Sequence, residues 1–189
     1  KQRVTIDRWT EKNQGKVSLF AVASGKRNNQ PLLDLLTAFN RGSLYYGMQD
    51  QELEALLRQL IVGIRNPIGK EIHVTLVQSK KGNSVTLFPA QQFLPNLYEE
   101  IPFIVYGVAD RLEEFHLFFQ GRYYDKYFDI KKKVSFLSAA RGDSQELERA
   151  VALLKAYEYY YQFLKEGKTT YLFQAKQLLI PYNIPIAFQ

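Results

Sequence analysis

The chain of 189 residues contains no cysteine, which excludes disulfide bonds, thiolate metal sites and a cysteine nucleophile. It has no uninterrupted apolar run of the roughly 18 residues that a membrane-spanning helix needs. The polar residues 1–3 do not open a signal peptide. The first residue is Lys1 and not methionine, from which we expect a processed protein or a fragment of a longer one.

Aromatic residues are abundant, and the charge is mildly positive. Tyrosine and phenylalanine each occur 13 times, and aromatic residues make up 14% of the chain. This density is typical of β-strands, of thick packing between layers or of an adhesive surface. The net charge of +6 is compatible with acidic proteins, anionic polymers or nucleic acid as partners, and it selects none of them.

The first third of the chain has the pattern of an α/β unit. Residues 1–15 are polar, with Trp9 as their one large anchor, and the apolar residues 17–24 predict a strand buried on both faces. Gly42 is expected to end the helix that follows. The later elements of this part are a helix over 31–39, a strand over 43–47 and a helix over 50–64. Strand, helix, strand and helix in this order predict a right-handed unit with a central first strand.

After Pro67 the pattern changes to short strands. Residues 71–77 alternate between apolar and polar, and residues 80–83 predict a turn that returns the chain as a hairpin strand over 84–88. Further strands are expected over 101–109, 114–120, 127–130 and 133–137. Strands at this spacing indicate a sandwich or a partial barrel.

A long helix follows the strands. Asp143 and Glu146 form a capping box at its start, and the helix is expected to stop at Gly167. At least half of the aromatic side chains in residues 157–163 are expected to be buried against the sheet. A short helix and an extended tail complete the chain.

These patterns together predict the fold class α/β, with a partial doubly wound parallel sheet followed by a mainly-β sandwich with C-terminal helices. We expect two domains. Residues 1–66 form the α/β part, and residues 67–189 form the sandwich-like part with its long helix, at about 143–166, and the tail.

The residues that most often carry chemistry are few and isolated. His73 and His116 each lie on a predicted strand with no second ligand at metal-binding spacing, so we expect structural or surface histidines. Gly25 opens a loop after the buried strand without a phosphate-binding glycine motif. Ser24 lacks the surroundings of a hydrolase nucleophile. The sequence therefore predicts no catalytic residue, no cofactor-binding residue and no metal ligand.

Two pairs of neighbouring glutamates could in principle supply an acid and a base. They are Glu99 with Glu100, and Glu113 with Glu114. Adjacent positions on a strand point to opposite faces, so neither pair converges on one bond. We expect solvated loop carboxylates.

A basic and aromatic segment forms the one candidate interaction surface. Its residues are Arg122, Tyr123, Tyr124, Lys126, Lys131, Lys132 and Lys133. Basic residues among aromatic ones are one signature of single-stranded nucleic-acid binding. Asp125 and Asp129 dilute the charge, so an ordinary solvated hairpin is favoured over a nucleic-acid site.

Several segments resemble a known family. Residues 16–25 (KVSLFAVASG) and 32–46 (LLDLLTAFNRGSLYY) resemble the last two strands of a von Willebrand factor A (vWA) domain and the helix between them. Residues 53–64 resemble the final helix of that domain. Residues 95–98 (PNLY), 102–107 (PFIVYG) and 182–184 (YNI) resemble the β-rich region of inter-alpha-trypsin inhibitor heavy-chain-like proteins, which pair such a region with a vWA domain.

The resemblance implies adhesion, with a site that this chain does not carry. The family's metal-ion-dependent adhesion site uses an Asp-x-Ser-x-Ser loop, a threonine and a further aspartate from the first half of the domain, and Asp7 does not match the last of these. Mg²⁺ is therefore expected only in an intact protein. A parallel sheet without its first strands would expose a long edge, so we expect another segment or chain to complete it.

The sequence thus predicts a non-enzymatic protein–protein interaction or adhesion module. The alternatives are a β domain that binds a small apolar ligand and a basic binder of nucleic acid or an anionic polymer. We expect a protein partner, no membrane span, and a periplasmic, cell-surface or secreted setting in preference to the cytoplasm.

Overall fold

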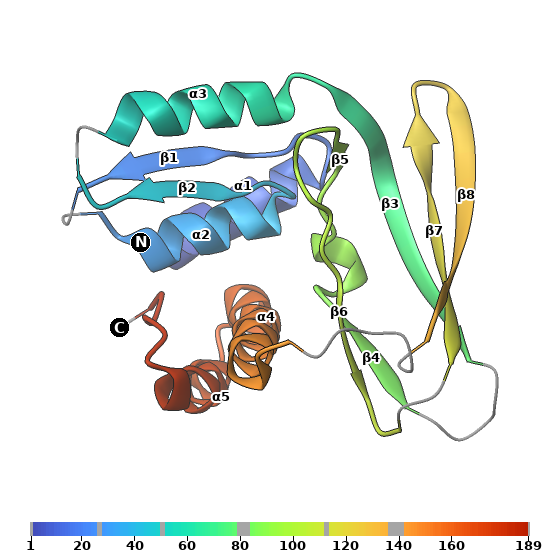
Figure 1. The fold of residues 1–189 in the computed structure, drawn as a ribbon. Coiled ribbons are helices and arrows are strands. Elements are labelled where there is room, and N and C mark those ends of the chain that lie inside the picture. Colours follow the sequence, from blue (N-terminus) through green and yellow to red (C-terminus); the bar gives the residue numbers. More distant parts are fainter. Residues whose placement is uncertain are drawn as a thin grey trace.

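The structure, a computed structural model, describes residues 2–25, 28–49, 52–78, 84–111, 114–135 and 142–188. Over these residues the chain is a mixed α/β protein, which confirms the predicted class at that level. The described strands form a two-stranded parallel sheet, a four-stranded antiparallel sheet and a separate two-stranded antiparallel sheet (Figure 1).

The predicted α/β unit is present. Strands β1 (Ala21–Ser24) and β2 (Leu44–Gly47) pair in parallel, with Ala21 opposite Leu44. Helix α2 (Gln30–Phe39) lies on one face of this sheet and helix α3 (Leu53–Ile64) on the other (Figure 1). Strand β1 is shorter than the apolar run predicted, and only Ala23 of its residues is buried.

The first residues form a helix, α1 (Gln2–Asn13), where no element was predicted. Its anchor is also a different residue, because Ile6 is 4% exposed whereas Trp9 is 59% exposed. Ile6 packs in the main hydrophobic core, whereas the Trp9 indole, three residues further along the helix, stays largely exposed. The expectation that Trp9 anchors this segment is therefore wrong.

The long strand β3 (Pro67–Gln78) lies within the four-stranded sheet, in the order β5-β3-β7-β8. Its neighbours are β5 (Leu97–Tyr98) and β7 (Phe115–Tyr123). Strand β4 (Val85–Phe88) pairs instead with β6 (Tyr106–Ala109).

The predicted hairpin between residues 71–77 and 84–88 is therefore wrong. Alternation fixes the faces of a strand but not its partner. The nine-residue strand β7 offers β3 a longer apolar face than the four residues of β4 do. The predicted turn at 80–83 lies outside the described residues.

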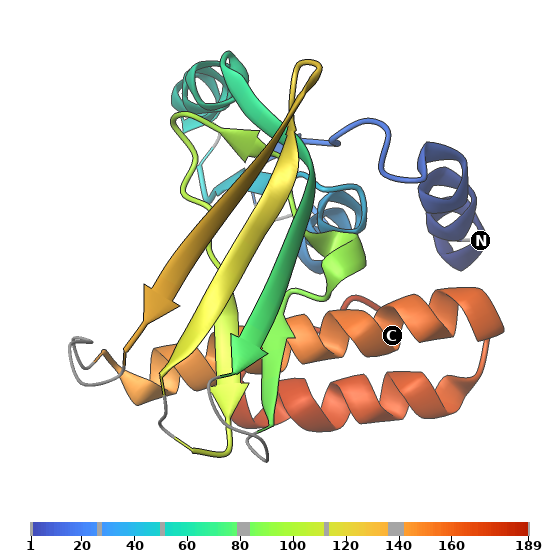
Figure 2. The ribbon, with the colours of Figure 1, turned by 90° about the vertical axis from the view of Figure 1, so that its right-hand side faces the viewer.

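Two predicted strands, 127–130 and 133–137, are one strand as far as the structure describes them. Strand β8 (Lys126–Val134) pairs with β7 without interruption from Tyr123 opposite Lys126 to Phe115 opposite Val134. It is the edge strand of the sheet, so its lysines reach water without breaking the pairing (Figure 2). The strand expected over 101–109 shortens to β6.

The C-terminal part is a helical hairpin of α4 (Ser144–Glu166) and α5 (Thr169–Leu179). The predicted start and stop of the long helix are confirmed. Asp143 accepts a hydrogen bond from the Gln145 N–H, and Gly167 ends the helix with φ of 73°. Short 3₁₀ turns lie at η2 (Gln91–Phe93) and η3 (Ile180–Tyr182).

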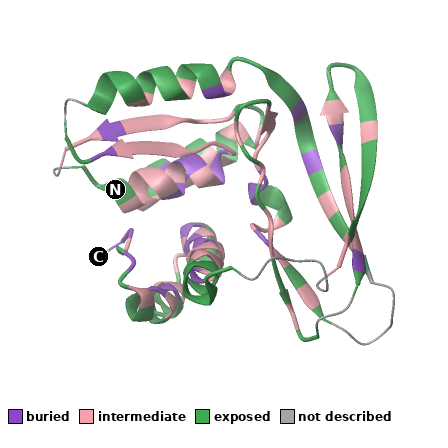
Figure 3. Cartoon of the chain, in the orientation of Figure 1, coloured by how far each residue is buried: buried purple, intermediate pink, exposed green. Residues whose placement is uncertain are grey.

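The helical hairpin packs mainly against α1 and α2, and α4 also contacts β4 of the two-stranded antiparallel sheet (Figure 1). The Tyr157 ring lies 6.3 Å from that of Phe39 in α2, and the Tyr160 ring lies 5.6 Å from that of Phe188 in the tail. The expectation that these aromatics are buried against the sheet is wrong for both tyrosines. Figure 3 shows buried segments on α2, on α4 and in the C-terminal tail, with further ones on the strands. The core joins both parts of the chain: Ile6, Leu35, Phe39, Phe93, Ala156, Tyr157, Tyr160, Leu164, Ala175, Leu179, Ile184, Ala187 and Phe188.

Helix α2 ends in a Schellman motif with Arg41 in the left-handed position. The Gly42 N–H donates to the Thr37 carbonyl at 2.9 Å, and the Arg41 N–H donates to Ala38 at 3.3 Å. Gly42 therefore lies one residue beyond the position that favours glycine. It is required for another reason, since a Cβ there would lie 1.8 Å from the Leu19 carbonyl oxygen.

Substituting Gly42→Ala is expected to lower the free energy of unfolding by at least about 2 kcal/mol, because the methyl group forces the backbone at Leu19 away. Denaturant unfolding measures the change. Gly107→Ala, where the new methyl group meets only side chains at 3.6 Å or more, is the control. Equal losses in the two variants would contradict the predicted clash.

A half-buried acid, Asp34, and a buried phenol, Tyr157, join α2 to α4. The Tyr157 hydroxyl donates a hydrogen bond to the Asp34 carboxylate. Burial raises the pKa of Asp34, and the hydrogen bond from Tyr157 offsets part of that rise. Burial and the neighbouring Asp34 charge raise the pKa of Tyr157. Burial therefore makes ionisation of the Asp34 carboxyl costly for the folded state.

Substituting Asp34→Asn is expected to stabilise the protein at pH 7 by about 1 kcal/mol, since the amide keeps an acceptor for Tyr157 and removes the buried charge. The folded-state pKa of Asp34 is raised, so its ionisation lowers stability as pH rises through that pKa. The gain should therefore fade as pH drops toward 3.8, the ordinary value of the carboxyl. Thermal melts from pH 3 to pH 8, with the exposed Asp110→Asn as control, test this, and a gain that does not depend on pH would refute it.

Candidate functional site

Strand β1 presents an open edge. Among the described strands it pairs with β2 alone. The N–H groups of Leu19, Ala21 and Gly25 donate toward β2, to the carbonyls of Asn40, Ser43 and Gly47. Successive residues of a strand direct their backbone groups to opposite edges. The N–H and carbonyl of Val22 therefore face the other edge, where the structure describes no pairing strand.

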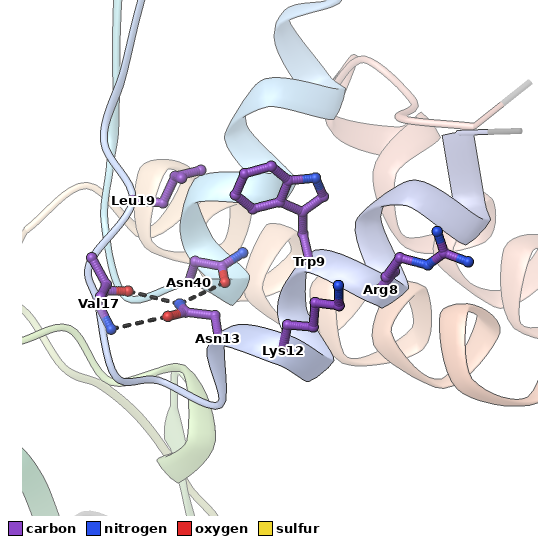
Figure 4. A pocket seen from close by; sticks show the side chains of 7 residues that line it. All are labelled: Arg8, Trp9, Lys12, Asn13, Val17, Leu19 and Asn40. Atoms are coloured by element: carbon purple, nitrogen blue, oxygen red, sulfur yellow. Dashed lines mark hydrogen bonds between the residues drawn. The ribbon is translucent and has the colours of Figure 1, made fainter.

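A cavity of about 530 Å³ lies beside the segment that leads into β1. It opens between that segment and α1, and the Trp9 indole projects into it (Figure 4). Its walls are mostly apolar, with two cations on the rim. The lining residues are Arg8, Trp9, Lys12, Asn13, Val17, Leu19 and Asn40. Large apolar side chains thus remain uncovered below the open edge.

Two asparagines hold this cavity in shape. The Asn13 amide donates to the Val17 carbonyl at 2.7 Å and to Asn40 Oδ1 at 2.8 Å, and it accepts from the Val17 N–H at 3.0 Å (Figure 4). Asn40 is 2% exposed and donates to the Leu36 carbonyl. Three of these contacts hold backbone groups and the fourth joins the two amides, so side-chain amides fix the position of α1 beside β1.

The other face of the parallel sheet also carries uncovered apolar residues. Leu53, Leu57 and Ile61 follow at four-residue intervals on α3 and so share one stripe of the helix. They are 40%, 42% and 63% exposed. Apolar surface therefore remains exposed in both helical layers that flank β1.

The predicted basic and aromatic surface is divided by the structure. Arg122, Tyr123, Tyr124 and Lys126 lie around the turn between β7 and β8, whereas Lys131 begins the far half of β8. Lys131 lies five positions after Lys126 along the strand, which corresponds to about 16 Å. Arg122 is also engaged with acids, at 3.2 Å from Asp125 and 4.0 Å from Glu71.

The three consecutive lysines do not share a face. Lys131 and Lys133 point to one side of β8, where Lys131 lies over the Phe118 ring and Lys133 pairs with Glu114 at 2.9 Å. Lys132 points to the other side, opposite Leu117. Lysines on an edge strand prevent pairing with another chain. The contacts favour that protective role over a continuous binding surface.

Substituting Lys131, Lys132 and Lys133 together by threonine is expected to make the protein self-associate, because the edge of β8 keeps its backbone groups and loses its charges. Sedimentation velocity over a range of concentrations measures this. A variant with Arg8, Lys12 and Lys16 changed to glutamine removes the same charge elsewhere and should stay at the wild-type mass. Self-association in both variants would point to net charge instead.

The other predicted residues behave as ordinary surface groups. His73 lies on β3 with its Nδ1 3.1 Å from Gln91 Nε2, and His116 lies on β7 opposite Lys133. Glu99 accepts from the Asn66 amide at 2.8 Å, and Glu100 lies 3.7 Å from Arg65.

Residues 26–27, after Gly25, and Glu113 lie outside the described residues. In the part of the chain that the structure covers, no cluster of histidine and acidic residues could hold a metal ion. No helix in that part is long and apolar enough to cross a membrane.

The comparisons with known proteins identify no family for this chain. No family model matches it, and no curated protein is significantly similar to it. The open edge of β1 and its apolar surroundings are therefore the observations from which a function has to be argued.

No pattern in the amino-acid sequence indicates this cavity directly. Three apolar residues in α1, Val4, Ile6 and Trp9, are too few for an amphipathic pattern. One available signal was the pair of asparagines at 13 and 40, since such side chains often fix backbone at helix ends.

Proposed function

We propose that this chain is a non-enzymatic protein–protein interaction module that binds its partner through the open edge of β1. The observation that carries the proposal is the edge at Val22, which no described strand pairs with, in a strand whose other edge is fully paired. Backbone groups at such an edge bind an added strand through main-chain hydrogen bonds.

The surroundings of β1 define the chemistry of the added strand. Parallel sheets are covered by helices on both faces, and their strands are apolar on both sides. Here α2 and α3 cover the two faces of the sheet, and Trp9 and Ile61 leave apolar surface beyond them. The added strand is therefore apolar and runs parallel to β1. The partner also supplies apolar side chains that pack into the Trp9 cavity.

The resemblance to a vWA domain gives this strand a place in a larger sheet. In that interpretation β1 and β2 are the last two strands of a partial doubly wound sheet, and the antiparallel strands belong to the sandwich-like β-rich region of the family. A Mg²⁺-dependent adhesion site would then lie on the strands that are added to the sheet at the open edge of β1. None of its ligands is assigned to this chain.

Substituting Val22→Pro is expected to leave the fold intact, because the lost N–H faces away from β2 and proline is tolerated on a free edge. Ala23→Pro removes an N–H that faces β2 and should cost about 3 kcal/mol or more. Denaturant unfolding of both variants tests the orientation of the edge. Equal destabilisation by the two prolines would show that the edge at Val22 is already paired.

The same variant tests the function. A partner captured by the wild-type chain, with and without Mg²⁺, should be lost with Val22→Pro and retained with Lys132→Gln, which lies on the other sheet. In the wild-type complex, the amide of Val22 should become protected from hydrogen exchange. Capture that Val22→Pro leaves unchanged would contradict strand addition at β1.

A further inference from the structure

A second cavity, of about 360 Å³, lies on a different side of α1 from the Trp9 cavity. Helix α1, the turn after α2, η2 and α4 surround it. Six of its lining residues determine its chemistry: Thr10, Phe39, Arg41, Phe93, Tyr161 and Lys165. Two of these carry positive charge and three are aromatic.

Arg41 occupies a backbone position that disfavours it. Its φ of 57° places it in the left-handed region, at the helix end where glycine is the common residue. Its guanidinium reaches across to Gly15, where an added Cβ would lie 2.8 Å from the Arg41 Cζ. Backbone strain of this kind is often found at functional sites, where the side chain of the strained residue takes part in the function.

That side chain is not satisfied by the protein. Within the described part of the chain, the buried Nε of Arg41 has no hydrogen-bond partner. The buried hydroxyl oxygen of Thr10, in the wall of the same cavity, also has none. Buried polar groups are almost always hydrogen-bonded in proteins. The Arg41 Nε and the Thr10 hydroxyl are thus two polar groups without a protein partner in the wall of one cavity, which favours an acceptor from outside the protein.

The aromatic side of the cavity is built as one unit. The rings of Phe39 and Phe93 stack at 5.0 Å, and the Tyr161 ring meets each of them edge-on, at 5.6 Å and 5.2 Å. Lys165 lies over the Tyr161 ring at 5.7 Å and pairs with Asp7 at 3.5 Å.

The charge of Lys165 is therefore partly neutralised by Asp7. Of the two cations in the cavity, Arg41 is then the one that can bind an anion. Glu11 also lines the cavity and carries the opposing charge.

We propose that this cavity binds a small carboxylate that carries a flat apolar group. The Arg41 guanidinium and the Thr10 hydroxyl donate to the carboxylate, and the flat group packs on the Tyr161 side of the aromatic cluster. This site is separate from the β1 edge, so it goes beyond the proposed partner binding and does not depend on it.

The test is a calorimetric titration of the full chain with benzoate, and with inorganic phosphate as the probe that lacks a flat group. Benzoate should bind more tightly than phosphate. Arg41→Gly should weaken benzoate binding by about tenfold or more, since a charge-assisted contact is lost. The same variant should melt at a higher temperature, because glycine relieves the left-handed backbone.

Two further variants separate binding from folding. Thr10→Val keeps the shape of the side chain and should weaken benzoate binding without lowering the melting temperature. Arg8→Gln also removes one positive charge, but from a position on α1 that does not line this cavity. It should leave the affinity for benzoate within about twofold of the wild-type value.

Wild-type protein that fails to bind benzoate at concentrations on the order of 10 mM would overturn the proposal. So would Arg41→Gly protein that binds as well as the wild type or melts at a lower temperature. Phosphate binding as tight as that of benzoate would overturn the role of the aromatic cluster.

Discussion

The packing of helix α2 on both of its sides is the constraint on which the rest of the structure depends. One side covers the parallel sheet, and the other meets the helical hairpin through Leu35 and Phe39, which are 0% and 4% exposed. A helix buried in this way has to be apolar around most of its circumference. The two parts of the chain share one core because α2 belongs to both layers.

The ends of α2 transmit this constraint to both candidate sites. Asn40, directly after the helix, holds α1 through Asn13 and shapes the Trp9 cavity. Arg41 is the next residue, and it points into the second cavity. Gly42 then passes so close to the Leu19 carbonyl that β1 and the end of α2 cannot move independently. Three consecutive residues thus connect the core with both cavities and with the segment that leads into β1.

The sequence predicted local structure well where caps and periodicity agree. The long helix α4 begins after Asp143 and ends at Gly167, as the capping pattern and the glycine indicated. Strand partners could not be predicted in the same way, because the alternation in β3 marks an inner face and leaves the neighbour open. The left-handed position of Arg41 could not be predicted, because glycine is the usual residue at the end of a helix. The neighbouring Gly42 was therefore expected to end α2.

The two sheets treat their edges in opposite ways. Strand β8 ends the antiparallel sheet with lysines that reach water, and such an edge resists pairing. Strand β1 has small apolar residues at its centre and no charged side chain at all. The two edges therefore differ in their resistance to an added strand, because lysines protect β8 and no charged side chain protects β1.

Helix α1 lies between the two cavities, with Trp9 on one side and Thr10 on another. Its position depends on the amide of Asn13 and on the Arg3 guanidinium, which donates to the Leu164 carbonyl of α4. A small displacement of this helix therefore changes both cavities at once. A molecule that binds in one cavity and fixes α1 then alters the affinity of the other cavity for its own ligand. Thermodynamic linkage requires that the second ligand alters the affinity of the first cavity by the same factor.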